Sequence, residues 1–266
     1  MPAEIKQLLP WLIRFAVLGG LYVAVVACAH FLADSQMFFP SMGSGRKPKE
    51  MIRIPQPDGT ALAALYLPNS AARHTVWFFH GNAEDLGDLE PLLLEFHRRG
   101  YAVFAYDYPG YGLSGGRPSE LSIYAATNTG ARYLRDTLKV PLDNVILYGR
   151  SIGAGPAVEL ALHEPVAGLV LQSAFMSAYR VMTRWRLLPF DKFENLRRLP
   201  EVHCPVLVMH GGEDRIVPPA HGEALLAAAA GPKRHLWIEA AGHNDFLAIA
   251  GERYWQALRE FEQGLP

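Results

Sequence analysis

Residues 145–153 read Val-Ile-Leu-Tyr-Gly-Arg-Ser-Ile-Gly, an apolar run that ends in a Gly-x-Ser-x-Gly pentapeptide, and a helix-like stretch follows from Ala154. A Gly-x-Ser-x-Gly turn between a strand and a helix is so tight that small residues must flank the serine, and the serine hydroxyl projects above the sheet. Ser151 is therefore the candidate covalent nucleophile. Because glycine and serine are common residues, the pentapeptide needs support from the rest of the chain.

Short apolar runs alternate with amphipathic segments on both sides of this stretch. Two runs at 51–54 and 61–66, joined through Pro57-Asp58-Gly59, predict a hairpin. Further strands are expected at 75–79, 102–105, 145–148, 168–171, 205–209 and 235–238, with helices near 86–99, 119–138, 152–163, 222–230 and 245–263. This alternation predicts an α/β fold, with a mostly parallel sheet of about eight strands, helices on both faces and an antiparallel hairpin at its start.

Candidate catalytic residues follow several of these strands. Ligand sites in such sheets lie at the carboxyl ends of the strands, so residues that follow different strands are expected to converge there. Ser151 follows one strand, Asp214 lies in the turn after the strand at 205–209, and His243 follows the last strand. The order Ser, Asp, His is the one expected of an α/β-hydrolase, and it differs from the orders on other serine-protease scaffolds.

These residues predict acyl transfer by a Ser-His-Asp triad. His243 is expected to take the proton from Ser151 as it attacks an acyl carbon, while Asp214 fixes the imidazole tautomer. The backbone amides of Ile152 and Asn82 are expected to form the oxyanion hole. Glu213 is the alternative to Asp214 as the acid of the triad. No cofactor or metal is expected, because no Cys/His pair shows ligand spacing and there is no His-Glu-x-x-His.

Other polar residues near these strands are predicted to have structural roles. His80 and His210 are expected to stabilise their turns rather than carry protons. Arg150 is expected to be a solvated or sheet-edge side chain, with contact to an acidic substrate group as the alternative. Asp107 is expected to stabilise a glycine-rich turn and has no obvious partner in the sequence. Residues 244–245 are expected to start the last helix, with a side chain capping its free amides.

Length and composition fit one large α/β domain with an N-terminal appendage. The chain has 266 residues, of which 50% are hydrophobic and 19% charged, and the formal net charge is −1. This balance gives no basic surface for nucleic acid. The two cysteines, Cys28 and Cys204, do not predict a disulfide framework, since one lies inside the N-terminal apolar stretch.

The N-terminal segment is predicted to meet a membrane, because residues 15–33 contain no Asp, Glu, Lys or Arg. At about 1.5 Å per residue this stretch barely spans the hydrocarbon core, so a short anchor helix is one possibility. Residues 25–28 read Val-Val-Ala-Cys, which has the form of a bacterial lipobox, and cleavage before Cys28 would leave a lipidated N-terminus. Of the two, we favour the lipoprotein, with lipidation at Cys28, over the anchor helix. Basic residues lie on both sides of the segment, so charge does not orient the domain across the membrane.

Three parts of the chain are predicted: a membrane anchor or lipoprotein signal at 1–35, a tether at 36–50, and a hydrolase domain at 51–266. Within that domain, residues 174–200 form the segment where α/β-hydrolases insert a lid. It is short, at 27 residues, and rich in apolar side chains: Met176, Tyr179, Met182, Trp185, Leu187, Leu188, Pro189 and Phe190. A small apolar cover and an open site are therefore expected, with about half of these residues packed on the sheet.

Several segments, taken in order, resemble one known family. They read His-Gly-Asn-Ala-Glu-Asp-Leu-Gly at 80–87, Tyr-Asp-Tyr-Pro-Gly-Tyr-Gly at 106–112 with Gly-Arg-Pro-Ser-Glu at 116–120, Leu-Tyr-Gly-Arg-Ser-Ile-Gly at 147–153, and Gly-His-Asn-Asp at 242–245. From about residue 75 to 246 the chain resembles the α/β-hydrolase-domain depalmitoylases of eukaryotes and the related Bem-forty-six-like membrane-associated hydrolases. The resemblance implies an α/β-hydrolase fold, with Ser151, Asp214 and His243 as the triad.

The resemblance also implies a class of substrate. The eukaryotic members cleave palmitoyl thioesters from proteins and reach membranes through a cysteine-rich, palmitoylated N-terminus, whereas this chain has an apolar segment with one cysteine. The expected function is a membrane-associated serine hydrolase for carboxylic esters or thioesters of acyl substrates, including lipids or acylated proteins. Two alternatives stay open: an aminopeptidase or amidase on the same triad, and a non-enzymatic hydrolase-like membrane scaffold.

Overall fold

Eight strands form one sheet in the order β1-β2-β4-β3-β5-β6-β7-β8. The structure is a computed structural model that describes residues 3–183 and 187–266, apart from the side chains of residues 3–7, 9, 30–33 and 41. The strands are β1 (Met51–Pro55), β2 (Ala61–Leu67), β3 (Thr75–Phe79), β4 (Ala102–Tyr106), β5 (Val145–Arg150), β6 (Gly168–Gln172), β7 (Val206–Gly211) and β8 (Lys233–Ile238). The strand β2 pairs antiparallel with β1 and with β4, and all the other pairs are parallel. The predicted fold class is confirmed.

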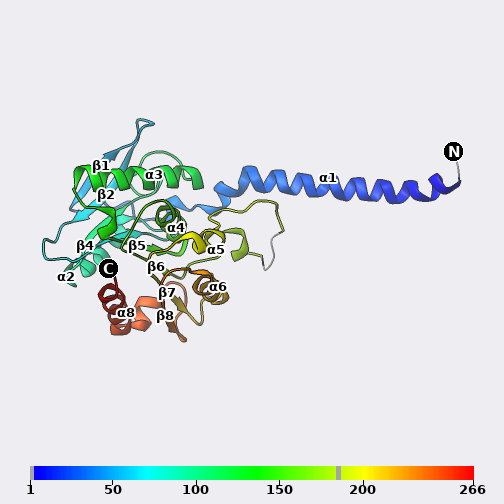
Figure 1. Ribbon diagram of the computed structural model, residues 1–266. Coiled ribbons are helices and arrows are strands. Elements are labelled where there is room, and N and C mark those ends of the chain that lie inside the picture. The colour runs from blue at the N-terminus through cyan, green and yellow to red at the C-terminus, as the bar shows by residue number, and fades with distance from the viewer. Residues whose placement is uncertain (1–2, 184–186) are drawn as a thin grey trace.

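Helices cover both faces of the sheet, as Figure 1 shows. They are α2 (Leu86–Arg98), α3 (Glu120–Arg132), α4 (Ala154–His163), α5 (Asn195–Arg198), α6 (Ala220–Ala228), α7 (Phe246–Ala250) and α8 (Glu252–Gln263). The helices α3, α4 and α6 contribute to one apolar core, and α2, α7 and α8 to a second core on the other face. Burial on both faces explains why β3, β4 and β6 read as continuous apolar runs rather than as alternating ones.

Short helical turns connect these elements. They are η1 (Pro40–Met42), η3 (Leu142–Asn144), η4 (Ser151–Gly153), η5 (Tyr179–Val181) and η6 (Leu199–Glu201), all 3₁₀ turns, and the π-helical turn η2 (Tyr133–Thr137) that continues α3. The predicted lid lies between β6 and β7, where η5, α5 and η6 are found. Trp185, one of the apolar residues expected there, lies outside the described residues.

Two predictions about the C-terminus are wrong. The last helix is not continuous, because Gly251 adopts a φ of +54° and separates α7 from α8. Such a φ is readily available only to glycine, and it turns the chain so that α8 packs its apolar side on the sheet. The side chain of Asp245 does not cap α7; its Oδ1 instead accepts a hydrogen bond from the Gly242 amide at 2.7 Å. This bond stabilises the turn that carries His243.

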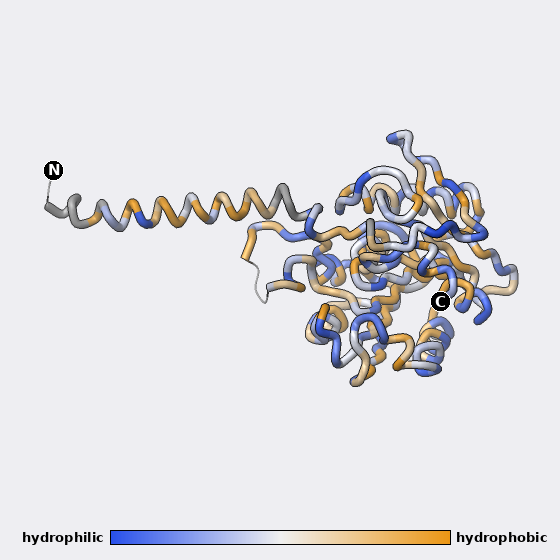
Figure 2. The backbone as a smooth tube through the Cα atoms, turned by 180° about the vertical axis from the view of Figure 1, so that it is seen from behind, coloured by the Kyte–Doolittle hydropathy of each residue, from blue (hydrophilic) through white to orange (hydrophobic). Residues whose placement is uncertain are grey.

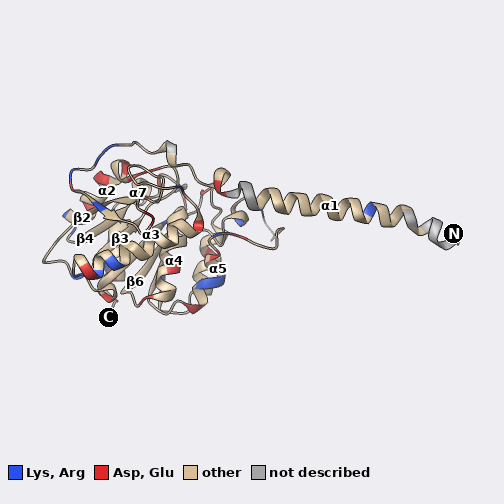
Figure 3. Ribbon diagram, turned by 90° about the horizontal axis from the view of Figure 1, so that it is seen from above, with Lys and Arg blue, Asp and Glu red and all other residues tan. Residues whose placement is uncertain are grey.

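The N-terminal helix α1 (Ala3–Met37) projects from the domain, and Figure 2 shows its apolar character along most of its length. Its stretch Pro10–Ala29 has a mean hydropathy of 2.1 and none of it is buried, so by length and composition it is able to cross a membrane. Cys28 lies within this helix and is exposed. Figure 3 shows acidic and basic residues interspersed over the domain, in keeping with the small net charge.

The segment that follows α1 lies against the domain. Phe38 is buried, and its ring meets that of Phe193 edge-on at 6.2 Å between centroids. Ser44 and Gly45 both donate hydrogen bonds to the Asp85 carboxylate, at 2.8 and 2.5 Å. The residues predicted as a tether are therefore held on the domain by specific contacts.

Candidate active site

The strand β5 ends at Arg150, and η4 begins at Ser151 in a sharp turn with a φ of +54°. A Cβ at Gly149 would lie 2.7 Å from the Cα of Ala154, and one at Gly153 would lie 2.2 Å from the Phe79 carbonyl oxygen. Both approaches are to backbone, so no side chain fits at either position. The two glycines therefore allow the serine to occupy a strained left-handed conformation above the sheet.

The structure brings Ser151, His243 and Asp214 together. The Ser151 Oγ lies 3.0 Å from His243 Nε2, and His243 Nδ1 lies 2.7 Å from Asp214 Oδ2. Each residue follows a different strand: Ser151 follows β5, Asp214 follows β7, and His243 follows β8. Glu213, the alternative acid, is exposed, whereas Asp214 is only 3% exposed.

The surroundings of Asp214 keep it ionised. Its Oδ1 accepts hydrogen bonds from the amides of Ile216 and Val217, at 2.9 and 2.7 Å. Burial alone would raise its pKa, but hydrogen bonds with His210 and His243 and the amide of Val217 outweigh burial and lower the pKa below its usual range. At neutral pH a carboxylate therefore faces His243 Nδ1, which must carry the proton in that contact.

The turn after β3 carries the predicted oxyanion donor Asn82. The short distance that a Gly153 Cβ would make to the Phe79 carbonyl shows that η4 lies against the end of β3. The side chain of Asn82 points to the N-terminal segment, where its Nδ2 donates to the Met37 carbonyl at 2.6 Å and its Oδ1 accepts from the Phe39 amide at 3.0 Å. That the backbone amides of Asn82 and Ile152 form the oxyanion hole remains a prediction.

Arg150 is neither solvated nor at a sheet edge, which corrects the prediction from sequence. Its guanidinium forms an ion pair with Glu84, with Nε 3.1 Å from Glu84 Oε1, and both side chains are mostly buried. Burial lowers the pKa of Arg150 to about 10, which still leaves it a cation at neutral pH. The same Glu84 oxygen accepts a hydrogen bond from the Gly81 amide. The pair thus ties the residue before Ser151 to the turn that carries Asn82.

Weakening this pair is expected to slow turnover. Glu84→Gln keeps an oxygen for the Gly81 amide but removes the charge that holds Arg150. Loss of the charge should loosen the turn at Asn82 and lower kcat by about tenfold with little change in KM, because oxyanion donors act mainly in the transition state. Steady-state kinetics on a soluble ester measures this. Glu95→Gln, which breaks the exposed pair with Arg99, is the matched control. A lower melting temperature with unchanged kcat would assign Glu84 a structural role alone.

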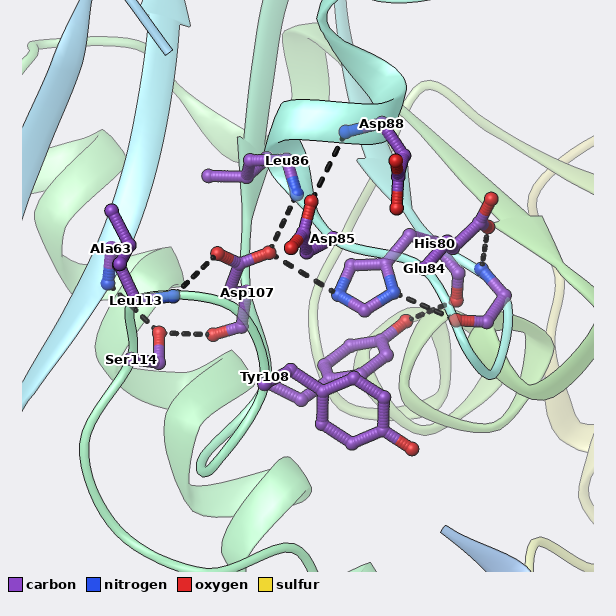
Figure 4. A network of polar contacts seen from close by, with 12 residues as sticks. Ala63, His80, Glu84, Asp85, Leu86, Asp88, Asp107, Tyr108, Leu113 and Ser114 are labelled. Atoms are coloured by element: carbon purple, nitrogen blue, oxygen red, sulfur yellow. Dashed lines mark hydrogen bonds and ion pairs between the residues drawn. The ribbon is translucent and has the colours of Figure 1, made fainter. Parts of the chain in front are cut away.

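A buried polar network lies behind the same turn (Figure 4). His80 is fully buried, with Nδ1 2.8 Å from the Gly81 carbonyl and Nε2 3.8 Å from Asp107 Oδ1. Asp107 accepts hydrogen bonds from the amides of Leu86 and Leu113, at 2.8 and 3.3 Å. Asp107 therefore stabilises its turn as predicted, but it also has partners that the sequence did not reveal. Burial lowers the pKa of His80 to about 4 and raises the pKa of Asp107 to about 7.

Asp107→Asn is expected to change the pH dependence of stability. Because the pKa of Asp107 is raised in the folded state, its contribution to stability is present at low pH and lost as pH rises through about 7. A shift from 3.8 to about 7 corresponds to at most about 4 kcal/mol. The free energy of unfolding of Asp107→Asn minus that of the wild type should therefore increase between about pH 4 and 7. Urea denaturation at several pH values measures this difference. A flat difference would mean that Asp107 is charged throughout.

Among the side chains that the structure describes, no group of three or more His, Cys, Asp or Glu is arranged to hold a metal ion. The chemistry that the arrangement supports is proton transfer between Ser151 and His243, with Asp214 orienting the imidazole. Nucleophilic acyl transfer uses an arrangement of this kind.

The known proteins that are similar to this chain are α/β-hydrolases. A family model described as serine aminopeptidase, S33, matches residues 70–196. The alpha/beta hydrolase domain-containing protein aho-3 of Caenorhabditis elegans is 41% identical over 202 residues, which cover 73% of this chain and 58% of that protein. Alpha/beta hydrolase domain-containing protein 17B of Homo sapiens is 36% identical over 209 residues, which cover 76% of this chain and 71% of that protein. An esterase from Pyrococcus furiosus shares the fold, with a TM-score of 0.69 at 20% identity over 81% of this chain and 91% of that one.

Proposed function

Since the chain belongs to the α/β-hydrolase family of the alpha/beta hydrolase domain-containing proteins 17, we propose that it is a membrane-associated serine hydrolase that cleaves ester or thioester bonds of acyl substrates. The observation that carries this proposal is the hydrogen-bonded series from Ser151 Oγ through His243 to Asp214, at 3.0 and 2.7 Å. Membership of the family supports hydrolysis in general, and this series supports a serine nucleophile.

In the proposed reaction, His243 Nε2 takes the proton of Ser151 while Oγ forms a bond to the acyl carbon. The negative charge that develops on the acyl oxygen is met by the amides of Ile152 and Asn82. His243 then gives the proton to the leaving oxygen or sulfur, and the acyl group stays on Ser151. A water molecule, deprotonated by His243, releases the acid and restores the serine.

An aminopeptidase or amidase on the same residues is the second candidate, because the matching family model is described as a serine aminopeptidase. The two reactions differ in the leaving group. An amine must be protonated before it leaves, whereas an alkoxide needs this less and a thiolate least, so the rates on matched anilide, ester and thioester substrates separate them.

We propose membrane association through α1, whose apolar stretch Pro10–Ala29 has no buried residue. The sequence predicts either an anchor helix or a lipoprotein cleaved before Cys28. Cleavage there would remove most of the stretch Pro10–Ala29. The hydrogen bond from the Tyr22 hydroxyl to the Leu187 carbonyl in the predicted lid favours the uncleaved helix. Mass spectrometry of the mature N-terminus decides between the two.

The test of the proposed chemistry is labelling with a fluorophosphonate probe, followed by mapping of the labelled peptide. Wild-type protein should be labelled at Ser151 alone, and the labelled protein should lose its esterase activity. A p-nitrophenyl ester series of increasing chain length, run beside acyl thioesters and aminoacyl anilides, then defines the substrate class. Absence of labelling would support a non-enzymatic scaffold instead.

A further inference from the structure

His210 is a buried histidine next to the candidate triad that the proposed reaction does not use. It lies in β7, and its side chain and that of Asp214 are both fully buried. The ring Nε2 lies 2.8 Å from the Val217 carbonyl oxygen and 3.4 Å from Asp214 Oδ2. Because a carbonyl oxygen only accepts hydrogen bonds, Nε2 must carry the proton. The two acceptors therefore share one N–H, with the shorter contact to the carbonyl.

The His210 ring is held in this orientation from its other side. A Cβ at Gly222 in α6 would lie 2.7 Å from His210 Nδ1, so the helix lies directly against that edge of the ring. Among the residues that the structure describes, Nδ1 has no hydrogen-bond partner. A second proton on the ring would therefore be buried without an acceptor, which is unfavourable. The ring thus presents a single donor, at Nε2, to Asp214 and Val217.

The two oxygens of the Asp214 carboxylate have different partners. Oδ1 accepts hydrogen bonds from the amides of Ile216 and Val217, at 2.9 and 2.7 Å. Oδ2 faces two imidazoles, with His243 Nδ1 at 2.7 Å and His210 Nε2 at 3.4 Å. An N–H beside a buried carboxylate stabilises its negative charge. The carboxylate then attracts a proton on the neighbouring imidazole less strongly, so His210 bears on how readily His243 is protonated.

The other titratable and charged groups around Asp214 are placed differently. His221, in α6, accepts a hydrogen bond from the Met176 amide through Nδ1, at 3.0 Å. Burial, together with the nearby charge of Arg180 in η5, lowers the pKa of His221 below its ordinary value, so His221 adds no charge at neutral pH. The charged side chains of the adjoining turns are exposed: Glu213, Arg215, Glu239 and Asp245. His210, by contrast, is buried and faces Oδ2 directly.

We propose that His210 is a positioning residue of the triad, whose Nε2–H takes up part of the negative charge of Asp214 Oδ2 and so keeps His243 available as a base at lower pH. The inference rests on the function proposed above, because it concerns the same His243 and Asp214. In that reaction His210 acts through Asp214 and takes no proton itself. Its contact with the Val217 carbonyl also stabilises the turn from 214 to 217, which is the role that the sequence predicts.

The test compares the pH dependence of kcat/KM for His210→Leu and His210→Gln with that of the wild type, on the full chain and with p-nitrophenyl butyrate as substrate. Leucine fills the space next to the backbone but has no donor, whereas glutamine carries an amide nitrogen that reaches toward the position of Nε2. The matched control is His74→Leu, because His74 is also a buried histidine that faces a carboxylate, with Nδ1 3.1 Å from Glu262 Oε1. Neither His74 nor Glu262 has a role in the proposed reaction.

In His210→Leu, the Asp214 carboxylate should hold the imidazolium form of His243 more firmly. The acid limb of the kcat/KM profile, which reports the essential base, should therefore move by about 0.5 to 1 to higher pH. Below the midpoint this displacement is a loss of about 3- to 10-fold in kcat/KM, and the loss should disappear by about pH 9. His210→Gln should restore the wild-type profile, and His74→Leu should keep it.

A loss in His210→Leu that is equal at every pH would assign His210 a structural role alone and overturn the proposal. An unchanged profile would also overturn it, as would the same displacement in His74→Leu or in His210→Gln. If His210→Leu does not fold, His210→Asn tests the same point, since its amide ends near the position of Nδ1 and supplies no donor at Nε2. Wild-type protein without esterase activity would remove the proposed function itself, whereas an active wild type beside an unaffected His210→Leu would remove this inference alone.

Discussion

Ser151→Ala is expected to lower kcat for ester hydrolysis by about 10⁶-fold, because covalent catalysis has no substitute nucleophile at this position. The Ser151 Oγ is the atom that faces His243 Nε2, at 3.0 Å, and Ser151 lies in the tight turn between Gly149 and Gly153, where no side chain fits at either glycine. Alanine places only a methyl group there, so neither proton transfer nor acylation can occur. Residual hydrolysis would come from water oriented in the site.

The fold should survive this change. Ser151 already holds a φ of +54°, and alanine is subject to the same backbone strain as serine there, so the melting temperature should change little. The measurement is single-turnover and steady-state kinetics on p-nitrophenyl butyrate, with labelling by fluorophosphonate on the same samples. Substantial activity in a folded Ser151→Ala protein would mean that another residue is the nucleophile and that the proposed function is wrong.

The sheet and the positions of the candidate residues were predictable from the sequence because both depend on short-range patterns. Continuous apolar runs mark strands that are buried on both faces, and the residues that follow parallel strands meet at one edge of the sheet. Ser151, Asp214 and His243 each follow such a strand, and the structure brings them within hydrogen-bonding distance. The backbone therefore determines their convergence before any side-chain detail matters.

The contacts that support the site could not be predicted, because they join residues that are far apart in the chain. Arg150 and Glu84 are separated by 66 positions, and nothing in either local sequence indicates the other. The hydrogen-bond donors to the Asp107 carboxylate are the backbone amides of Leu86 and Leu113, and a backbone amide has no signature in the sequence. Gly251 divides the last helix, although an isolated glycine in a helical pattern is often tolerated.

The contact between the N-terminal segment and the candidate site could not be predicted from the sequence for the same reason. The sequence predicts a role for the backbone amide of Asn82. The structure shows that its side chain also bonds to the Met37 carbonyl and the Phe39 amide, and that the Tyr111 hydroxyl donates to its Oδ1 at 2.5 Å. The end of α1 therefore contacts the turn that is predicted to stabilise the oxyanion.

Asp214→Asn is expected to lower kcat by about 10⁴-fold, whereas Glu213→Gln should change it by less than about threefold. The reason lies in the partners of the carboxylate. Oδ1 accepts hydrogen bonds from the amides of Ile216 and Val217, so in the variant the amide oxygen must stay on that side and the NH₂ group must replace Oδ2. The NH₂ group would then face His243 Nδ1, which lies 2.7 Å from Oδ2 in the wild type.

Two donors cannot share that contact, so His243 would have to move its proton from Nδ1 to Nε2. An imidazole protonated at Nε2 cannot accept the proton of Ser151, and the nucleophile would remain a neutral hydroxyl. Glu213 is exposed, so its substitution removes no such contact. Kinetics of both variants from pH 6 to 10, beside their melting temperatures, provides the measurement. A larger loss in Glu213→Gln than in Asp214→Asn would assign the acid of the triad to Glu213 and show that the Asp214 contact is structural.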